Sequence, residues 1–175
     1  MLTLSLLRHA KSDWGAFDLD DFDRALAPRG IKAAPLIGKA LSRLGLKPDL
    51  VLCSGAVRTR ATLALILPQL GAPPPAIHYD DQLYLAPPAT MLEVAIGAAV
   101  AAEPARHVMV IAHNPGTHAL ALELTGSGDK KAIAELASKF PTAALAVLRF
   151  ETDDWRDVHA GMGELTHFIT PKGLD

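Results

Sequence analysis

Arg8 and His9 stand directly behind an apolar run, Leu4 to Leu7, and they form the pair with the clearest chemical potential in this sequence. Histidine can attack phosphorus and carry the phosphoryl group as a covalent intermediate. The arginine guanidinium keeps its charge at ordinary pH, and its planar fork matches phosphate oxygens. A strand that ends on this pair would place a nucleophile beside an anion clamp, at the edge where open α/β sheets bind ligands.

Two other apolar runs end in residues of the same kind. The run that ends at Cys53 is followed by Arg58, one turn into the next expected helix, and the run that ends at Ala112 is followed by His113 and another helix start. In a parallel sheet, the three strand ends lie on one edge. Two imidazoles and two guanidiniums would then share a cleft with helix N-termini, which carry free N–H groups. Such a cleft is expected to bind a compact dianion, and phosphate is the obvious one.

Each of these residues also has an ordinary structural explanation. His9 could be a loop or core residue, Arg58 could lie on a solvated helix face, and His113 could bond to the backbone of a turn. Taken singly, these explanations are favoured. Taken together, two His and two Arg residues at matching strand ends favour a functional site.

A metal centre is the competing use of His9 and His113. A hydrolytic metal site normally needs further His or carboxylate ligands at strand ends or at i, i+4 spacing, and the sequence shows no such set. The acidic residues within 18–23 could bind a hard cation, but such loops are usually solvated, and this is the favoured interpretation. We therefore expect neither a metal nor an organic cofactor.

The elements that must position these residues alternate along the chain. This alternation predicts an α/β fold, a three-layer sandwich whose mainly parallel sheet has helices on both faces. Residues 10–28 are expected to form a long loop, Ser54 to cap the second helix and Pro68 to end it. The polar stretch before the last strand indicates an antiparallel return or an edge pair. The expected strands are residues 2–7, 49–53, 76–79, 107–112, 143–150 and 164–170, and the expected helices are residues 30–44, 54–67, 88–102, 116–124 and 130–138.

Length and composition limit the classes of protein. The chain has 175 residues, of which 50% are hydrophobic, and this suits a single domain over residues 1–175. A net charge of −2 argues against a broad nucleic-acid footprint. A single cysteine, Cys53, fits a reducing compartment. We expect no signal peptide, and no apolar stretch of the sequence reaches the roughly 18 residues of a membrane helix. We expect a cytoplasmic protein with no membrane partner.

The chain resembles the histidine phosphatase superfamily, which has the phosphoglycerate-mutase-like fold. Within that superfamily it is most similar to the small SixA-type phosphohistidine phosphatases. The matching segments are residues 7–14, 53–62, 110–116 and 141–145.

The resemblance implies a role for each site residue. His9 would be the nucleophile that takes the phosphoryl group, while Arg8, Arg58 and His113 would surround the phosphate and stabilise its charge. Ser12 matches a position that often assists in binding. The two arginines should lower the pKa of His9 and keep it neutral, and a backbone acceptor should fix its tautomer. The implied partner is a phosphorylated protein or a small phosphorylated substrate, and no cofactor is implied.

Two departures from the family pattern bear on the substrate. Ala10 stands where the superfamily has glycine. In addition, no carboxylate acid for the leaving oxygen is identified, although Asp80, Asp81 and Glu93 lie in the relevant third of the chain. An alkoxide needs a proton donor, whereas a protonated phosphohistidine leaves as neutral imidazole. The expected function is therefore a phosphohistidine phosphatase; the alternatives are a general small-molecule phosphomonoesterase and a non-catalytic phosphate- or phosphoprotein-binding module.

Overall fold

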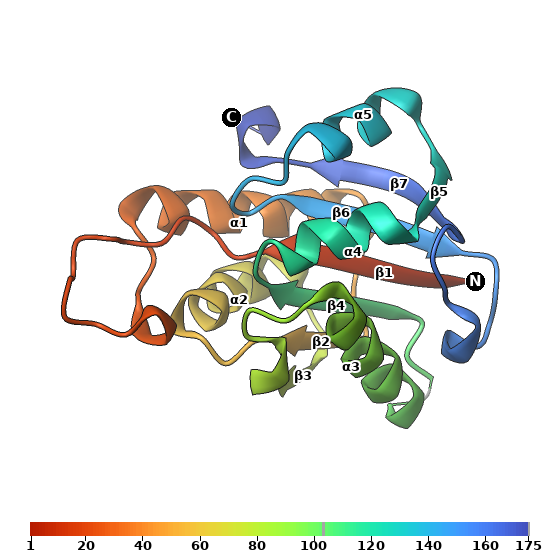
Figure 1. Ribbon diagram of the computed structural model, residues 1–175, viewed down its shortest axis with the longest axis horizontal. Helices are drawn as coiled ribbons and strands as arrows, with labels where there is room; N and C mark the ends of the chain where they lie inside the picture. The colour runs from red at the N-terminus through yellow and green to blue at the C-terminus, as the bar shows by residue number, and fades with distance from the viewer. Residues whose placement is uncertain (103, 175) are drawn as a thin grey trace.

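The computed structural model describes residues 1–102 and 104–174. Within this part of the chain, seven strands form one sheet in the order β3-β2-β4-β1-β6-β7-β5 (Figure 1). The strands are β1 Leu2–Arg8, β2 Leu50–Cys53, β3 Ala76–Tyr79, β4 His107–Ala112, β5 Thr125–Gly128, β6 Leu145–Phe150 and β7 Gly163–Ile169.

Most neighbouring strands run parallel. β1 pairs in parallel with β4, β4 with β2, β2 with β3, and β5 with β7. β6 is antiparallel to both of its neighbours, β1 and β7. The carboxyl ends of β1, β2 and β4 consequently meet at one edge, on the left of Figure 1, where the long loop after β1 extends from the sheet.

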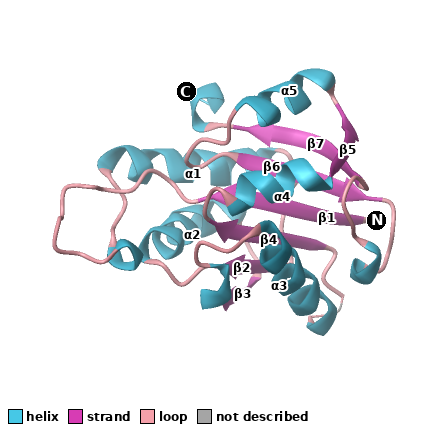
Figure 2. Ribbon diagram, in the orientation of Figure 1, coloured by secondary structure: helices cyan, strands magenta, loops and turns pink. Residues whose placement is uncertain are grey.

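Helices cover both faces of the sheet, as Figure 2 shows. Residues of α1 and α2 pack in one hydrophobic cluster, and residues of α3, α4 and α5 pack in the other. The fold is therefore the expected three-layer α/β sandwich. The helices are α1 Pro28–Arg43, α2 Val57–Leu70, α3 Pro88–Ala101, α4 Gly116–Leu124 and α5 Lys130–Ser138, with 3₁₀ turns η1 Asp21–Asp23, η2 Asp81–Leu83, η3 Trp155–Asp157 and η4 Pro171–Leu174.

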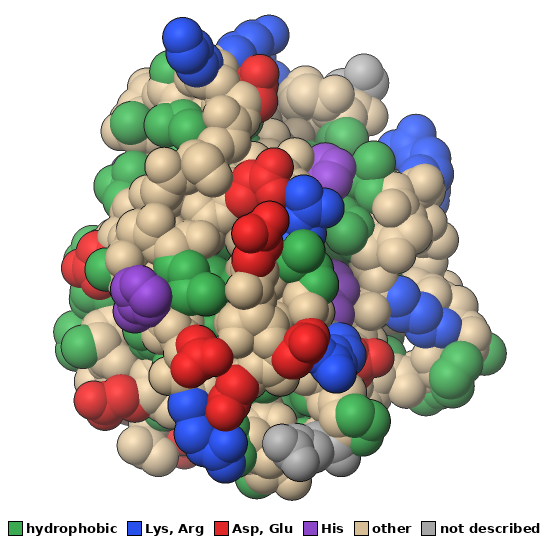
Figure 3. Space-filling model, turned by 90° about the vertical axis from the view of Figure 1, so that its right-hand side faces the viewer, with side chains coloured by type: hydrophobic (Ala, Val, Ile, Leu, Met, Phe, Trp, Pro, Cys, Tyr) green, Lys and Arg blue, Asp and Glu red, His purple; other side chains and the backbone are tan. Residues whose placement is uncertain are grey.

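The edge at which β1, β2 and β4 begin carries acidic and basic side chains next to one another (Figure 3). Arg106 precedes β4 and lies 2.6 Å from Asp153, which follows the antiparallel β6. Arg149 of β6 lies 2.6 Å from Glu164 of β7. Charges at this edge are thus arranged as pairs of opposite sign.

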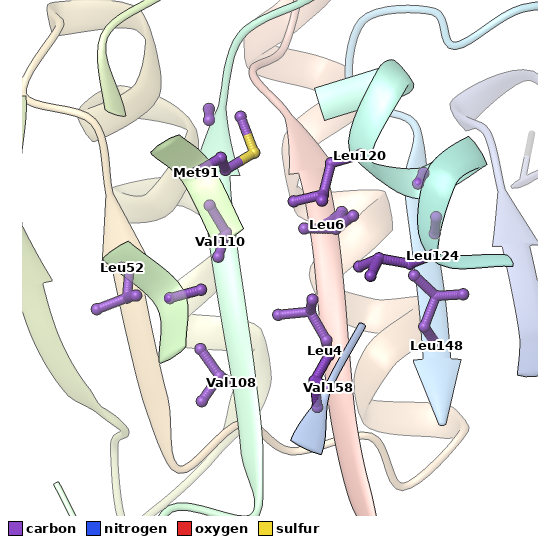
Figure 4. Close-up of a cluster of buried hydrophobic side chains, with 14 of the residues drawn as sticks. Leu4, Leu6, Leu52, Met91, Val108, Val110, Leu120, Leu124, Leu148 and Val158 are labelled. Carbon is purple, nitrogen blue, oxygen red and sulfur yellow. The ribbon is translucent and has the colours of Figure 1, made fainter. Parts of the chain in front are cut away.

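The central strands are buried on both faces, and this explains their continuous apolar sequences. Every residue of β4 is buried. In Figure 4, Leu6 of β1 lies next to Leu120 of α4, Leu4 lies next to Val158, and Met91 of α3 lies next to Val110 of β4. Burying a side chain of this size contributes about 1.5–3 kcal/mol, so this packing holds the strands that carry Arg8 and His113.

Two expectations about element boundaries were wrong, and one strand was not expected. α2 begins at Val57 with Ala56 at its N-cap, because the Ser54 hydroxyl bonds to a side chain of the site instead of capping the helix. α2 also continues through Pro68 to Leu70 and ends where Gly71 adopts a φ of 74°. The strand β5 was not expected, because its sequence Thr-Gly-Ser-Gly has low strand propensity and pairs with β7 through the backbone.

Candidate active site

The edge where β1, β2 and β4 end brings together four of the side chains singled out in the sequence. Arg8 ends β1 and His9 follows it, while His113 follows β4 and Arg58 lies in the first turn of α2. The ring centroids of His9 and His113 are 5.3 Å apart. Arg58 Nε lies 3.4 Å from His9 Nε2. Parallel pairing of β1, β4 and β2 accounts for this convergence.

The His9 ring is oriented by its own backbone neighbour. His9 Nδ1 lies 2.7 Å from the carbonyl oxygen of Ala10. A carbonyl can only accept a hydrogen bond, so Nδ1 carries the proton and the unprotonated Nε2 accepts the long hydrogen bond from Arg58 Nε. Burial, together with the charges of Arg58 and Arg8, lowers the pKa of His9 to about 4, although the Ala10 bond opposes this change. Near neutral pH the ring is therefore uncharged and nucleophilic at Nε2.

Arg58 is held by Asp21, which the long loop after β1 carries into the site on η1. Arg58 is 3% exposed, and it donates from Nη1 to the Asp21 carbonyl at 2.6 Å and from Nη2 to Asp21 Oδ2 at 2.9 Å. Arg24 Nη2 and the Tyr84 hydroxyl also donate to this carboxylate, each at 2.5 Å. These contacts fix the direction of the Arg58 fork.

The Asp21 carboxylate stays ionised. Partial burial raises its pKa, but the hydrogen bonds from Tyr84, Arg24 and Arg58 outweigh this effect and leave the pKa well below its ordinary range. An ionised carboxylate accepts hydrogen bonds and has no proton to donate. Asp21 is thus suited to position cations and unsuited to act as a general acid near neutral pH.

His113 is held by Ser54, the first residue after β2. His113 Nε2 lies 2.8 Å from Ser54 Oγ, while Nδ1 is buried and has no hydrogen-bond partner among the described residues. Burial, followed by the charges of His9 and Arg58, lowers the pKa of His113 to about 3. Tyr84 packs edge-on against the ring, with 5.2 Å between the ring centroids. The site therefore contains two neutral imidazoles among cationic arginines.

Arg8 is anchored to the backbone of the segment after α5. Its Nη1 donates to the Phe140 carbonyl at 3.0 Å, and Asn114 Nδ2 donates to the same oxygen at 2.9 Å. Arg8 Nε is buried and has no partner within the described part of the chain. A buried donor costs about 1–3 kcal/mol when it is unpaired, so an anion bound here would satisfy it.

Ser12 lies beside this group of side chains. It is buried, and its Oγ accepts a hydrogen bond of 3.4 Å from Arg24 Nη1. Within the described residues, no hydrogen bond joins its side chain to Arg8, His9, Arg58 or His113. Ser12 is connected to Arg58 only indirectly, because its partner Arg24 donates to Asp21, which in turn accepts from Arg58.

Within the described residues, none of the carboxylates considered as proton donors forms a hydrogen bond or ion pair with Arg8, His9, Arg58 or His113. Asp80 caps η2 by accepting from the Gln82 amide at 2.9 Å, and Asp81 packs its carboxylate over Gly55, where a Cβ would lie 1.9 Å from Asp81 Oδ1. Glu93 is exposed on α3. In the described residues, no three His, Cys, Asp or Glu side chains gather as ligands for a metal ion.

Four residues of the site were missed in the sequence. Asp21 was interpreted as part of a solvated acidic loop, Asn114 was noted only within the matching segment 110–116, and Arg24 and Tyr84 drew no attention. The loop length and the spacing of Asp21 and Arg24, three residues apart on the turn η1, could have signalled an ion pair. Tyr84 carried no comparable signal.

Comparisons with known proteins agree with this geometry. A model of the histidine phosphatase superfamily, branch 1, matches residues 4–84. An uncharacterised protein from Mycobacterium tuberculosis is 41% identical over 170 residues, covering 95% of this chain and 100% of the relative. A crystal structure of SixA from Agrobacterium tumefaciens, a proposed phosphohistidine phosphatase, has a TM-score of 0.78 and 32% identity and covers 97% of this chain and 99% of its own.

The chain belongs to the histidine phosphatase superfamily. A SixA structure from Nakamurella multipartitia, also a proposed phosphohistidine phosphatase, has the same TM-score of 0.78 at 32% identity and covers 97% of this chain and 96% of its own. Among histidine phosphatases, the chain is thus of the SixA type, with the phosphoglycerate-mutase-like fold expected from its sequence. None of the helices in the described residues is both long and apolar enough to cross a membrane.

Proposed function

We propose that this histidine phosphatase removes the phosphoryl group from phosphohistidine on a protein, through a covalent intermediate on His9. The observation that carries the proposal is the state of the His9 ring. Its Nδ1 proton is bound to the Ala10 carbonyl and its Nε2 lone pair lies beside Arg58. This is the tautomer and orientation that attack on phosphorus needs.

In the first step, the Nε2 lone pair of His9 forms a bond to phosphorus while the phosphorus–nitrogen bond of the substrate breaks. The electron pair returns to the substrate imidazole, whose other nitrogen already carries a proton, so it leaves neutral. Arg8, Arg58 and His113 surround the transferred group and stabilise the charge on its oxygens. The positive charge that arises on the His9 ring is stabilised through the Nδ1–H bond to Ala10.

In the second step, water attacks phosphorus and the bond to His9 breaks. The ring recovers its lone pair and keeps the Nδ1 proton, while the protons of the water stay with the phosphate that is released. Neither step requires a proton from the protein. This agrees with the ionised state of Asp21, the carboxylate that reaches the site.

The test measures phosphate release by the wild type and by His9→Ala, on a phosphohistidine-carrying protein and on p-nitrophenyl phosphate in parallel. We expect a strong preference for phosphohistidine and no turnover by the variant, with thermal unfolding of both proteins as the control for folding. Preference for the aryl ester would instead identify a small-molecule phosphomonoesterase. Equal inactivity of two folded proteins on both substrates would favour a phosphate-binding module.

A further inference from the structure

A groove of about 820 Å³ runs beside the candidate active site, between the start of α1 and the end of α5. Apolar side chains form part of its surface, including Leu36 of α1 and Phe168 of β7. Its polar lining is strongly biased in charge. Among the described residues, the cations that line it are Lys11, Arg29, Lys32, Lys139 and Lys172, whereas the acidic lining consists of Glu135.

These five cations are not arranged as ion pairs. Within the described residues, no Asp or Glu side chain lies within 4.0 Å of any of their charged nitrogens, and Arg29, Lys32 and Lys139 are exposed. At the opposite edge of the sheet, acidic and basic side chains alternate and pair (Figure 3). The chain as a whole has a net charge of −2, so the groove is a local positive region on an acidic protein. Like charges held together repel unless an anion binds, which makes this region a suitable site for an acidic ligand.

The groove adjoins two backbone segments of the catalytic edge. Lys11 is two residues from His9, so their Cα atoms are at most about 7.6 Å apart. On the other wall, Pro141 and Thr142 follow Phe140, whose carbonyl holds Arg8. The same short segments thus line both the phosphate site and the groove.

The wall formed by α1 is fixed against the backbone next to His9. A Cβ on Gly30 would lie 2.3 Å from the Lys11 carbonyl oxygen, so the two backbones are in direct contact. The Ala27 amide also donates to this carbonyl at 2.9 Å. The backbone that carries Arg29 and Lys32 is therefore anchored beside Lys11.

We propose that this groove binds an acidic segment of the substrate protein, next to the phosphohistidine that enters the site. The proposal rests on the proposed function and adds the kind of sequence that the enzyme selects. The charge of the groove specifies acidic residues, and its apolar floor provides contact area for a peptide rather than for a free anion. The Cα atoms of Lys11 and His9 are at most about 7.6 Å apart and each extended residue spans about 3.5 Å, so the bound segment should begin about two to three residues from the phosphohistidine.

The test uses two fluorescein-labelled peptides, each with one histidine and a run of four residues beginning about three positions from it. The run is glutamate in one peptide and glutamine in the other. Binding of the unphosphorylated peptides is measured by fluorescence anisotropy, and hydrolysis is measured on the same peptides phosphorylated at histidine. We expect the glutamate peptide to bind about tenfold more tightly, an advantage that decreases between about 50 and 300 mM salt.

The matched variants carry equal changes in charge. Lys32→Glu/Lys139→Glu reverses two charges in the groove, whereas Lys130→Glu/Lys131→Glu reverses two exposed charges at the start of α5, outside its lining. The advantage of the glutamate peptide should disappear in the first variant and persist in the second. Equal losses in both variants, or equal binding of the two peptides by the wild type, would overturn the proposal.

The two readouts separate this proposal from the proposed function. Selective binding without hydrolysis of the phosphorylated peptides would refute the phosphatase activity and leave the groove assignment intact. Hydrolysis of both phosphorylated peptides at the same rate, with no selective binding, would refute the groove assignment alone.

Discussion

Replacement of Arg58 by methionine tests the electrostatics of the site most directly. Methionine keeps much of the buried stem and removes the guanidinium beside His9 Nε2. In the wild type, the pKa of His9 falls from 6.5 to about 4. At about 1.4 kcal/mol per pKa unit, the protein favours the neutral ring by about 3 kcal/mol.

Burial is the largest cause of this change, and Arg58 is the first of the cations that add to it. Removing Arg58 favours the charged ring, so the pKa of His9 should rise but remain below 6.5. The loss of a preorganised donor should also lower kcat/KM on phosphohistidine by about 10²–10³-fold. At pH 6 the two effects act in the same direction, because a larger fraction of His9 is protonated.

The assay is an NMR titration of the His9 ring, assigned by comparison with His9→Gln, together with kcat/KM at pH 8. Arg58→Lys is the control, since it keeps the charge and loses the fork that Asp21 orients. It should keep the pKa of His9 low while still losing activity. A His9 pKa that is unchanged in Arg58→Met would refute the electrostatic argument.

Three further outcomes are expected. Burial lowers the pKa of His107 to about 4, so the folded protein binds fewer protons than the unfolded chain between about pH 6.5 and 4. The free energy of unfolding, measured with urea, should therefore be fully retained above pH 6.5 and decrease as the pH falls toward 4, with a weaker dependence in His107→Gln. Gly116→Ala should destabilise the protein by about 1–3 kcal/mol, because the new Cβ would lie 2.0 Å from the Ala86 carbonyl oxygen. The control is Gly97→Ala on α3, whose new Cβ would meet nothing within 4 Å and which should not lower the Tm. Ser12→Ala should lower kcat/KM less than tenfold, because its single hydrogen bond to Arg24 is long, and a larger loss would indicate direct contact with the phosphate.

The sequence predicted the sheet, both helix layers and the meeting of His9, Arg8, Arg58 and His113. This succeeded because apolar runs of strand length are a strong signal, and because parallel pairing fixes where residues after those runs must lie. Each apolar run can be recognised from neighbouring residues alone, and the rule that parallel strands end at the same edge of a sheet then places the residues that follow.

The contribution of Asp21 could not be derived in the same way. Its loop has no periodicity, and an acidic residue in such a loop is ordinarily solvated. Only the tertiary path of residues 10–27 brings its carboxylate to Arg58 and Tyr84. For Ser54, a local signal predicted the wrong role. A serine between a strand and a helix matches the pattern of an N-cap, but the Ser54 hydroxyl bonds to His113.

Two side chains at the centre of the site are held by carbonyl groups of the main chain. The Ala10 carbonyl orients His9, and the Phe140 carbonyl orients Arg8. Any amino acid supplies this oxygen, so alanine scanning would not detect either anchor. What must be preserved is the course of the backbone at positions 10 and 140, and residues that look unrelated to catalysis can meet that requirement. Histidine phosphatases of this type could therefore differ at both positions and still present the same reactive ring.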